Sequence, residues 1–453
     1  MDATDLAFAG LARQAELIWA GDVSSRELTE LYLERIERLE PQLRCYRVVL
    51  ADEALAAADA ADARRGDGAP PLNGVPIAIK DDTDIAGEVS ALGSLAHGGP
   101  AGEDDEIVKR LRAAGCVLLG KTHVPELATM PATESLAFGA THNPWDLART
   151  PGGSSGGSGA AVAAGLAAAA LGSDGAGSIR IPAAACGLFG LKPSRDLLPN
   201  ARDWKGLSAA GPIARGVLDA ALFTDAAGAD GMAAAARREP GVLRIAYSLS
   251  VARGLTASAD DEQRNALLQT AERLRDLGHT VEERDPDYGS MTVNVTTRYL
   301  DAVRDSGESM PHPERLARAT RGLVSMGAKL PSFLVSRAHA QEESDRRRIA
   351  DSLEGFDVLM TPVFTRRPPL IGEWSGLPAP VMLNGMANFV AYLPIWNHTG
   401  QPAAAVPVEA APDGFPVAIQ LVGRRGDDAT LLSLSAQLET DTGWLERRPP
   451  LAA

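Results

Sequence analysis

Hydrophobic and polar residues along this chain alternate between helical and strand-like spacing. Over residues 26–40, apolar side chains recur every three or four positions, which predicts an amphipathic helix. Ser24 and Glu27 form a capping-box pattern at its start. Residues 74–79 are a short, mostly apolar run, typical of a strand buried on both faces, and Lys80 stands at its end.

The same alternation continues to the end of the chain. Further helices are expected at 52–65, 106–114, 215–226, 260–277 and 428–438. Further strands are expected at 116–119, 243–247, 280–282, 356–360, 403–408 and 416–422. This order predicts an α/β fold in which helices cover a sheet. No linker or repeat divides the sequence, so we expect one domain over residues 1–453, with a charged helical excursion at about 285–350.

Small residues dominate the stretch from residue 149 to residue 182. It begins with a Gly/Ser loop at 152–157, continues with a predicted small-residue helix at 158–171, and reaches a second glycine-rich turn at 174–178. Glycine permits positive φ and close backbone approach, so two such loops can bring hydroxyls and free N–H groups together. The pattern predicts a site for acyl-transfer chemistry.

Composition and charge exclude several other classes of function. The formal net charge of −15 argues against general nucleic-acid binding. The basic run 346–348 follows Glu342 and Glu343 at a spacing of four, which indicates a solvated helix face instead of a binding patch. Neither the three cysteines nor the seven histidines have metal-ligand spacing, so we expect no metal and no cofactor.

The sequence favours a cytoplasmic protein without a membrane anchor. Three widely spaced cysteines are typical of a reducing compartment. The N-terminus lacks the basic start of a signal peptide, and the longest apolar run, 160–172, is too short to span a bilayer.

Lys80 is one of six lysines in a chain with 38 arginines. A desolvated lysine can become a neutral base, whereas arginine keeps its proton. Lys80 could equally reach out to pair with Asp81 or Asp82. The serine loops favour the first interpretation, because a serine nucleophile needs a base and no histidine lies near either loop.

Two other motifs compete with this interpretation. G-x-S-x-G occurs twice, centred on Ser154 and Ser155, but a nucleophile elbow needs a strand before it and residues 146–151 are not strand-like. A phosphate-binding loop would need G-K-[ST] after its glycines, which is absent.

Several motifs together resemble the amidase signature family. They are G-V-P-I-A-I-K-D at 74–81, T-P-G-G-S-S-G-G-S-G at 150–159, L-G-S-D-G-A-G-S-I-R-I-P-A at 171–183, N-H-T-G-Q-P at 397–402 and G-F-P-V-A-I-Q-L-V-G at 414–423. The resemblance covers nearly the whole chain and is strongest to general amidases of actinobacterial type. It implies a large mixed central β-sheet covered on both faces by α-helices.

Carried over residue by residue, the family's Ser–cisSer–Lys triad falls on Ser178, Ser154 and Lys80, with a cis peptide bond before Ser154. The resemblance also implies supporting residues of three kinds: oxyanion-hole N–H donors at Gly175, Ala176, Gly177 and Ser178; bracing side chains at Asp174, Arg180 and Ser155; and substrate-pocket candidates at Thr129 and Met130.

The implied activity is hydrolysis of a small-molecule carboxylic amide, and also of esters, through an acyl-enzyme. The alternative is the glutamine-amidotransferase subunit of a tRNA transamidation complex, which shares the catalytic core. The resemblance is compatible with a homodimer.

Three positions depart from the family pattern, and the mildest change is Ser194 in place of threonine. Ala176 stands where the family has glycine, and His123 stands where it often has asparagine. We expect Ala176 to have a negative φ, because alanine avoids positive φ, and we expect His123 to brace a loop instead of taking part in catalysis.

Overall fold

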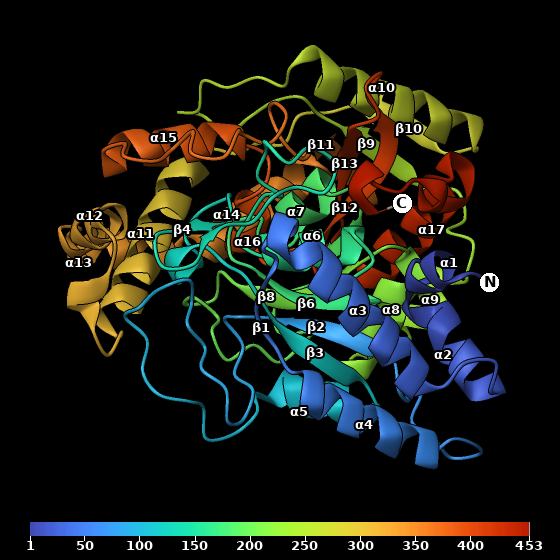
Figure 1. Ribbon diagram of the computed structural model, residues 1–453. Helices are drawn as coiled ribbons and strands as arrows, with labels where there is room; N and C mark the ends of the chain where they lie inside the picture. The colour runs from blue at the N-terminus through green and yellow to red at the C-terminus, as the bar shows by residue number, and fades with distance from the viewer. Residues whose placement is uncertain (453) are drawn as a thin grey trace.

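A long β-sheet runs through the middle of the molecule in the computed structural model, which describes residues 1–452 (Figure 1). Its strands follow the order β1-β3-β2-β6-β8-β7-β12-β13-β11-β9-β10. Their bounds are β1 Tyr46–Val49, β2 Pro76–Lys80, β3 Val117–Thr122, β6 Ala169–Asp174, β7 Phe189–Lys192, β8 Ala209–Ala214, β9 Arg244–Tyr247, β10 Thr280–Glu283, β11 Val358–Pro362, β12 Ala403–Ala410 and β13 Pro416–Val422. A short ribbon pairs β4 Glu134–Ser135 with β5 Gly139–Ala140.

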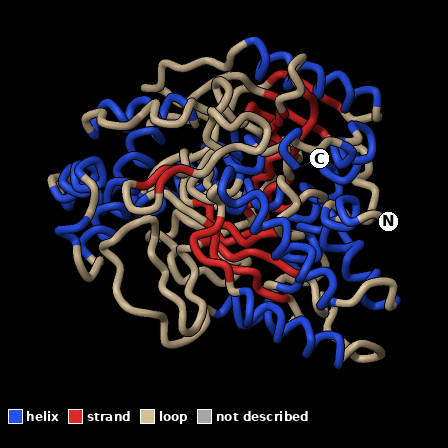
Figure 2. Tube along the Cα trace, in the orientation of Figure 1, coloured by secondary structure: helices blue, strands red, loops and turns tan. Residues whose placement is uncertain are grey.

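The sheet is mixed, as predicted. β2 runs parallel to β3 and β6, and β9 runs parallel to β10 and β11, whereas the pairs between them are antiparallel. Figure 2 shows these strands as a red band enclosed by helices. The prediction of one domain over residues 1–453 stays a prediction, although the sheet joins strands from both ends of the sequence.

Helices flank this sheet, which confirms the predicted α/β class. α6 and α7 pack together against its centre, and α8, α9 and α17 form another group that contacts β8 and β12. The helices are α1 Ala3–Ala7, α2 Gly10–Ala20, α3 Ser25–Leu43, α4 Ala51–Ala63, α5 Glu106–Ala113, α6 Gly156–Ala163, α7 Arg180–Ala185, α8 Val217–Ala226, α9 Met232–Ala236, α10 Asp261–Asp276, α11 Met291–Glu308, α12 Arg318–Ala328, α13 Ser332–Ala340, α14 Glu342–Ser352, α15 Ala379–Phe389, α16 Ile395–His398 and α17 Asp428–Thr442.

Helix α3 shows how the local sequence determines where a helix begins and which of its faces is buried. Ser24 and Glu27 form the predicted capping box: the Glu27 N–H donates to Ser24 Oγ at 3.0 Å, and the Ser24 N–H donates to the Glu27 carboxylate at 2.8 Å. The apolar stripe is buried, with Leu28 and Tyr32 fully covered. The capping pattern and the hydrophobic stripe therefore both agree with the fold.

The small-residue stretch was predicted wrongly in its second half. The expected helix at 158–171 is only α6, which ends at Ala163; Gly165 then has φ +65, and residues 169–174 form strand β6. An alanine run has helical propensity but no periodicity to distinguish a buried helix from a buried strand. Pairing of β6 with β2 and β8 decides the outcome.

The predicted helical excursion is present as α11 to α14; α11, α12 and α13 lie at the left of Figure 1, opposite both termini. Glu343 pairs with Arg347, as the spacing of four predicts, and also with Arg346. Glu342 does not pair with Arg346; it contacts Arg195 and Arg298 instead. The excursion is thus tied by charge to the loop after β7.

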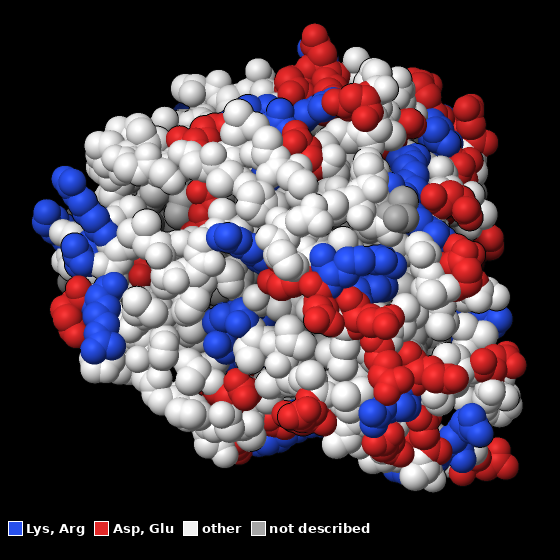
Figure 3. Space-filling model, viewed as in Figure 1, with Lys and Arg blue, Asp and Glu red and all other residues white. Residues whose placement is uncertain are grey.

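Acidic side chains are densest at the lower right of the face shown in Figure 3, the region where α2 and α4 lie in Figure 1. Among residues 1–452, we find no helix with the length and apolar character needed to cross a membrane.

Candidate active site

Strand β2 places Lys80 in the interior. The strand lies between β3 and β6, all five of its residues are buried, and the Lys80 side chain is 0% exposed. Lys80 Nζ lies 2.8 Å from Ser154 Oγ and 2.7 Å from Ser173 Oγ. The Asp82 carboxylate is 3.2 Å away. The lysine therefore does not snorkel to solvent, but it does pair with one of the two aspartates that follow it.

Ser154 lies in the loop that leads into α6. The Gly153–Ser154 peptide bond is cis, as the resemblance implied. A Cβ at Gly153 would lie 2.7 Å from the Met130 carbonyl oxygen and 2.8 Å from the Ala132 nitrogen, so only glycine fits here. The loop is thereby pressed against the segment that contains the predicted pocket residues.

Ser178 lies in the turn between β6 and α7. The Ser155 N–H donates to the Ser178 carbonyl at 3.2 Å, which joins the two glycine-rich loops. Ser155 Oγ lies 3.3 Å from the Ser173 carbonyl oxygen and is fully buried. Ser154 and Ser178 line the same cavity. The structure thus brings the three predicted catalytic residues to one place.

Asp174 and Arg180 brace this turn through a buried ion pair. Arg180 Nε and Nη2 each donate to the Asp174 carboxylate at 2.9 Å, and both side chains are 0% exposed. Arg180 also donates to Gln420 at 2.5 Å and to Asn397 at 2.7 Å. Burial acts to raise the pKa of Asp174, but Arg180 lowers it well below the usual value, so the carboxylate stays charged.

Asn397 and Gln420 were not singled out from the sequence. Asn397 Nδ2 donates to the Asp174 backbone carbonyl at 2.6 Å, so it holds the start of the same turn. Both residues lie in motifs that carried the family resemblance, N-H-T-G-Q-P and G-F-P-V-A-I-Q-L-V-G. The sequence therefore contained both residues within recognisable motifs, although it assigned neither of them a role.

The turn offers backbone N–H groups to the cavity. The Gly177 N–H is engaged, because it donates to Asp174 Oδ1 at 2.6 Å. Within the described residues 1–452, the N–H groups of Ala176 and Ser178 have no protein acceptor, and both residues line the cavity, as does Gly175. Gly177 has φ +122, whereas Ala176 does not have a positive φ, in agreement with the expectation from its methyl group.

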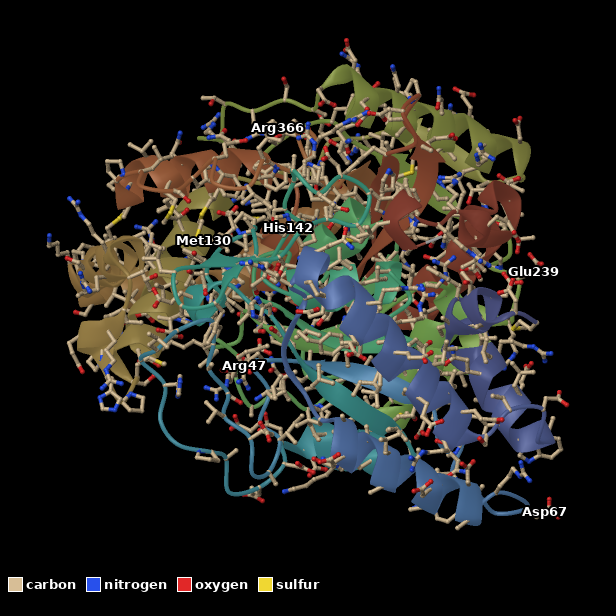
Figure 4. All side chains as sticks on the ribbon, in the orientation of Figure 1. Arg47, Asp67, Met130, His142, Glu239 and Arg366 are labelled. Carbon is tan, nitrogen blue, oxygen red and sulfur yellow. The ribbon has the colours of Figure 1, made fainter. Side chains whose placement is uncertain are left out.

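The cavity above the serines has a volume of about 100 Å³. The predicted pocket residues Thr129 and Met130 line it, and Figure 4 shows Met130 between the sheet and the helices α11 and α15. No individual residue of those two helices was named as a pocket candidate from the sequence. The lining residues of α11 are Val295, Thr296 and Tyr299, and those of α15 are Leu383, Met386 and Ala387.

His123 is buried beside this site but does not line the cavity. Its ring centroid lies 5.9 Å from that of Phe138, and its backbone carbonyl accepts from the Gly157 N–H. Burial, with Arg47 and Arg44 nearby, lowers the pKa of His123 to about 4, so the ring is neutral near pH 7. These contacts agree with a bracing role.

The environment of Lys80 favours the neutral amine more than water does. Burial lowers the pKa of Lys80, while the carboxylates of Asp82 and Asp174 act to raise it, and burial dominates. A buried lysine within hydrogen-bond distance of a serine hydroxyl can act as a general base.

Known proteins resemble this chain over almost its whole length. A family model described as Amidase matches residues 27–432. AmiB2 of Mycobacterium tuberculosis, named as an inferred amidase, is 51% identical over 462 residues, with all of both chains covered. The 6-aminohexanoate-cyclic-dimer hydrolase of Paenarthrobacter ureafaciens is 33% identical over 484 residues, covering 97% of this chain and 96% of that protein.

Solved structures share the fold. A structure of 6-aminohexanoate cyclic dimer hydrolase superposes with a TM-score of 0.90 at 31% identity and full coverage of both chains. The peptide amidase of Stenotrophomonas maltophilia gives a TM-score of 0.77 at 28% identity, covering 97% of this chain and 98% of that one. The chain belongs to the amidase family, and it is a hydrolase of the carbon–nitrogen bonds of amides.

Proposed function

We propose that this amidase cleaves its substrate with Ser178 as nucleophile, Ser154 as proton relay and Lys80 as base. The observation that carries the proposal is the 2.8 Å contact between Lys80 Nζ and Ser154 Oγ, beneath a cavity that Ser178 also lines.

The reaction follows from this order of groups. Neutral Lys80 accepts the Ser154 proton, Ser154 accepts the Ser178 proton, and Ser178 Oγ attacks the amide carbonyl carbon. The N–H groups of Ala176 and Ser178 stabilise the oxyanion; each such donor contributes about 3 kcal/mol in the transition state. The relay then returns a proton to the leaving amine, and water hydrolyses the acyl-enzyme.

We further propose that the acyl group is neutral and apolar. The walls above the serines are mostly hydrocarbon, from Met130, Trp204, Leu207 and the cavity-facing residues of α11 and α15. In an apolar pocket of this kind, the walls hold the hydrocarbon part of the ligand and a few polar groups at one end fix its orientation. A panel of aliphatic and aryl amides and esters should include 6-aminohexanoate cyclic dimer, because one relative is named for hydrolysing it.

The test is a pair of serine variants on that panel. Ser178→Ala should lose at least about a thousandfold in kcat while its melting temperature stays near that of the wild type, since only a hydroxyl is removed. Ser208→Ala, which changes another serine of the same cavity, should keep kcat within a few-fold. Activity within tenfold of wild type in Ser178→Ala would exclude this nucleophile.

The transamidation subunit remains the alternative, and purification separates the two. The relatives described above are named as amidases or hydrolases, which favours an enzyme that works alone. Recombinant protein that is active without any copurified partner would exclude an obligate subunit. A cytoplasmic location is also proposed, supported by the three free, buried cysteines; cell fractionation tests it.

A further inference from the structure

Asp82 lies beside Lys80 and Ser173. It follows β2 by two residues, its side chain is 7% exposed, and it lines the substrate cavity. Its Oδ2 atom accepts a hydrogen bond from Ser173 Oγ at 2.5 Å and lies 3.2 Å from Lys80 Nζ. The neighbouring Asp81 has different partners, Arg47 at 2.7 Å and Lys121 at 3.4 Å.

Counting protons around Lys80 fixes the direction of each hydrogen bond. A carboxylate only accepts, so the single Ser173 hydroxyl proton points to Asp82. Ser173 Oγ must then accept an N–H from Lys80, 2.7 Å away. A second acceptor is supplied by Asp82 Oδ2 at 3.2 Å or by the Ser173 carbonyl at 3.3 Å.

A neutral amine has two N–H groups and one lone pair. Both N–H groups are taken by the acceptors just described, so the lone pair is left facing the remaining neighbour, Ser154 Oγ, at 2.8 Å. That is the orientation a base needs to take the Ser154 proton.

We propose that Asp82 is a positioning residue: through Ser173 it orients the Lys80 amine so that its lone pair faces Ser154, and its charge sets the pH at which the amine becomes available. This rests on the proposed function of Lys80 as base. No covalent step is assigned to Asp82.

Other charged groups around this cluster are few. Asp174 approaches Lys80 from β6, Arg202 donates to the Asp82 carbonyl at 2.7 Å from the loop after β7, and Asp105 lies near Asp82 at the start of α5. Burial acts to raise the pKa of Asp82, but Lys80 and Ser173 bring it below its usual value, so Asp82 is ionised at neutral pH. The anion stabilises the Lys80 ammonium, and removing it should make the amine neutral at lower pH.

The experiment measures kcat/KM and kcat against pH for Asp82→Asn, with Asp84→Asn as the matched control. Asp84 is a nearby carboxylate that pairs with Arg202 and not with Lys80. In Asp82→Asn, the rise of kcat/KM with pH should move down by about one pH unit or more. Its limiting kcat should fall about tenfold because the amine is no longer oriented, with KM changed less than threefold. A profile that coincides with wild type, with unchanged kcat, would overturn the proposal.

A second variant covers the case in which Asp82→Asn does not fold. Ser173→Ala keeps the Asp82 charge but removes the hydroxyl that links it to Lys80. Its limiting kcat should fall at least tenfold at unchanged KM; wild-type kcat would overturn the proposal. Fluorophosphonate labelling distinguishes failure of this proposal from failure of the proposed function. If Ser178 is labelled but the pH profiles of the variants are unchanged, only the role of Asp82 is excluded. If Ser178 is not labelled, the proposed function itself is excluded.

Discussion

The loops that hold the serines and the helices that cover them are built by different means. The catalytic floor, defined as Lys80 with residues 152–157 and 173–178, is held by buried charges, hydrogen bonds and backbone contacts. The helical wall, defined as α11 and α15, faces the cavity mainly with hydrocarbon; one polar contact is the Tyr299 hydroxyl, which donates to the Thr129 carbonyl at 2.6 Å.

This difference indicates that the floor carries the chemistry and that the wall sets the substrate specificity. A proton relay tolerates little displacement, so the floor uses directional bonds and residues too small to replace. The wall faces the cavity with side chains of similar polarity, which can be exchanged at small cost to the fold. We therefore expect changes in the floor to remove activity and changes in the wall to alter substrate preference.

The largest effect is expected for Lys80→Arg in the floor. Arginine keeps the positive charge but cannot give up its proton, so kcat should fall at least about a thousandfold. In the wild type, kcat/KM should rise with pH through an apparent pKa below that of a free lysine, because burial favours the neutral amine. Lys109→Arg, an exposed lysine paired with Glu103, is the control. An unchanged rate in Lys80→Arg would make Lys80 only an ion-pair partner.

Gly157→Ala should be the next most damaging change. The added Cβ would lie 2.4 Å from the His123 backbone nitrogen and 2.6 Å from the Cys45 carbonyl oxygen. Both are backbone atoms, which cannot rotate away as a side chain can. Overpacking of this kind costs about 3 kcal/mol, measurable by chemical unfolding. Gly102→Ala, with nothing within 4 Å, should stay within about 0.5 kcal/mol. Equal stabilities of the two variants would refute the close contact.

A change in the wall should be milder and different in kind. Leu383→Ala removes hydrocarbon from the cavity, so the ratio of kcat/KM for long over short acyl amides should rise about tenfold, with limiting kcat on the best substrate nearly unchanged. Val381→Ala, on the same helix but 54% exposed, should not alter the ratio. If both variants behave alike, α15 does not contact the acyl group.

The smallest effect is expected at the position that departs from the family pattern. Ala176 does not have a positive φ, so glycine relieves no strain and adds unfolded-state entropy; Ala176→Gly should lose about 0.5–1 kcal/mol of stability. The missing methyl should also admit bulkier acyl groups. A rise in melting temperature without any change in acyl preference would show that the methyl is strained.

The floor could be predicted from the sequence because its residues lie in short motifs. Lys80, Ser154 and Ser178 were identified there, and the structure places the two serines on one cavity with Lys80 in contact with Ser154. Asp82 was named as a possible partner of Lys80, but its contact with Ser173 was not identified, because only tertiary pairing of β2 with β6 brings the two together. The individual residues of the wall could not be named for a related reason: an apolar side chain on a helix gives no signal that distinguishes a pocket from a core.

Strand content was underestimated where alanine and glycine dominate. The first half of β6 was assigned to a helix, and β7 and β8 were not predicted. In these segments the strands are defined by their neighbours in the sheet, as when Ala169 to Asp174 pair with Ala214 to Ala209. Propensity is a weak guide when a chain segment is buried on every side.

The most direct test of the account is to identify the residue that becomes covalently modified. The protein should be treated with a fluorophosphonate, digested and sequenced by mass spectrometry, with Lys80→Arg treated in parallel. The account predicts one adduct, on Ser178, and labelling at least about a hundredfold slower in Lys80→Arg, because the nucleophile loses its base. An adduct on Ser154, Ser155 or Ser173 in its place, or equal labelling rates in the two proteins, would contradict it.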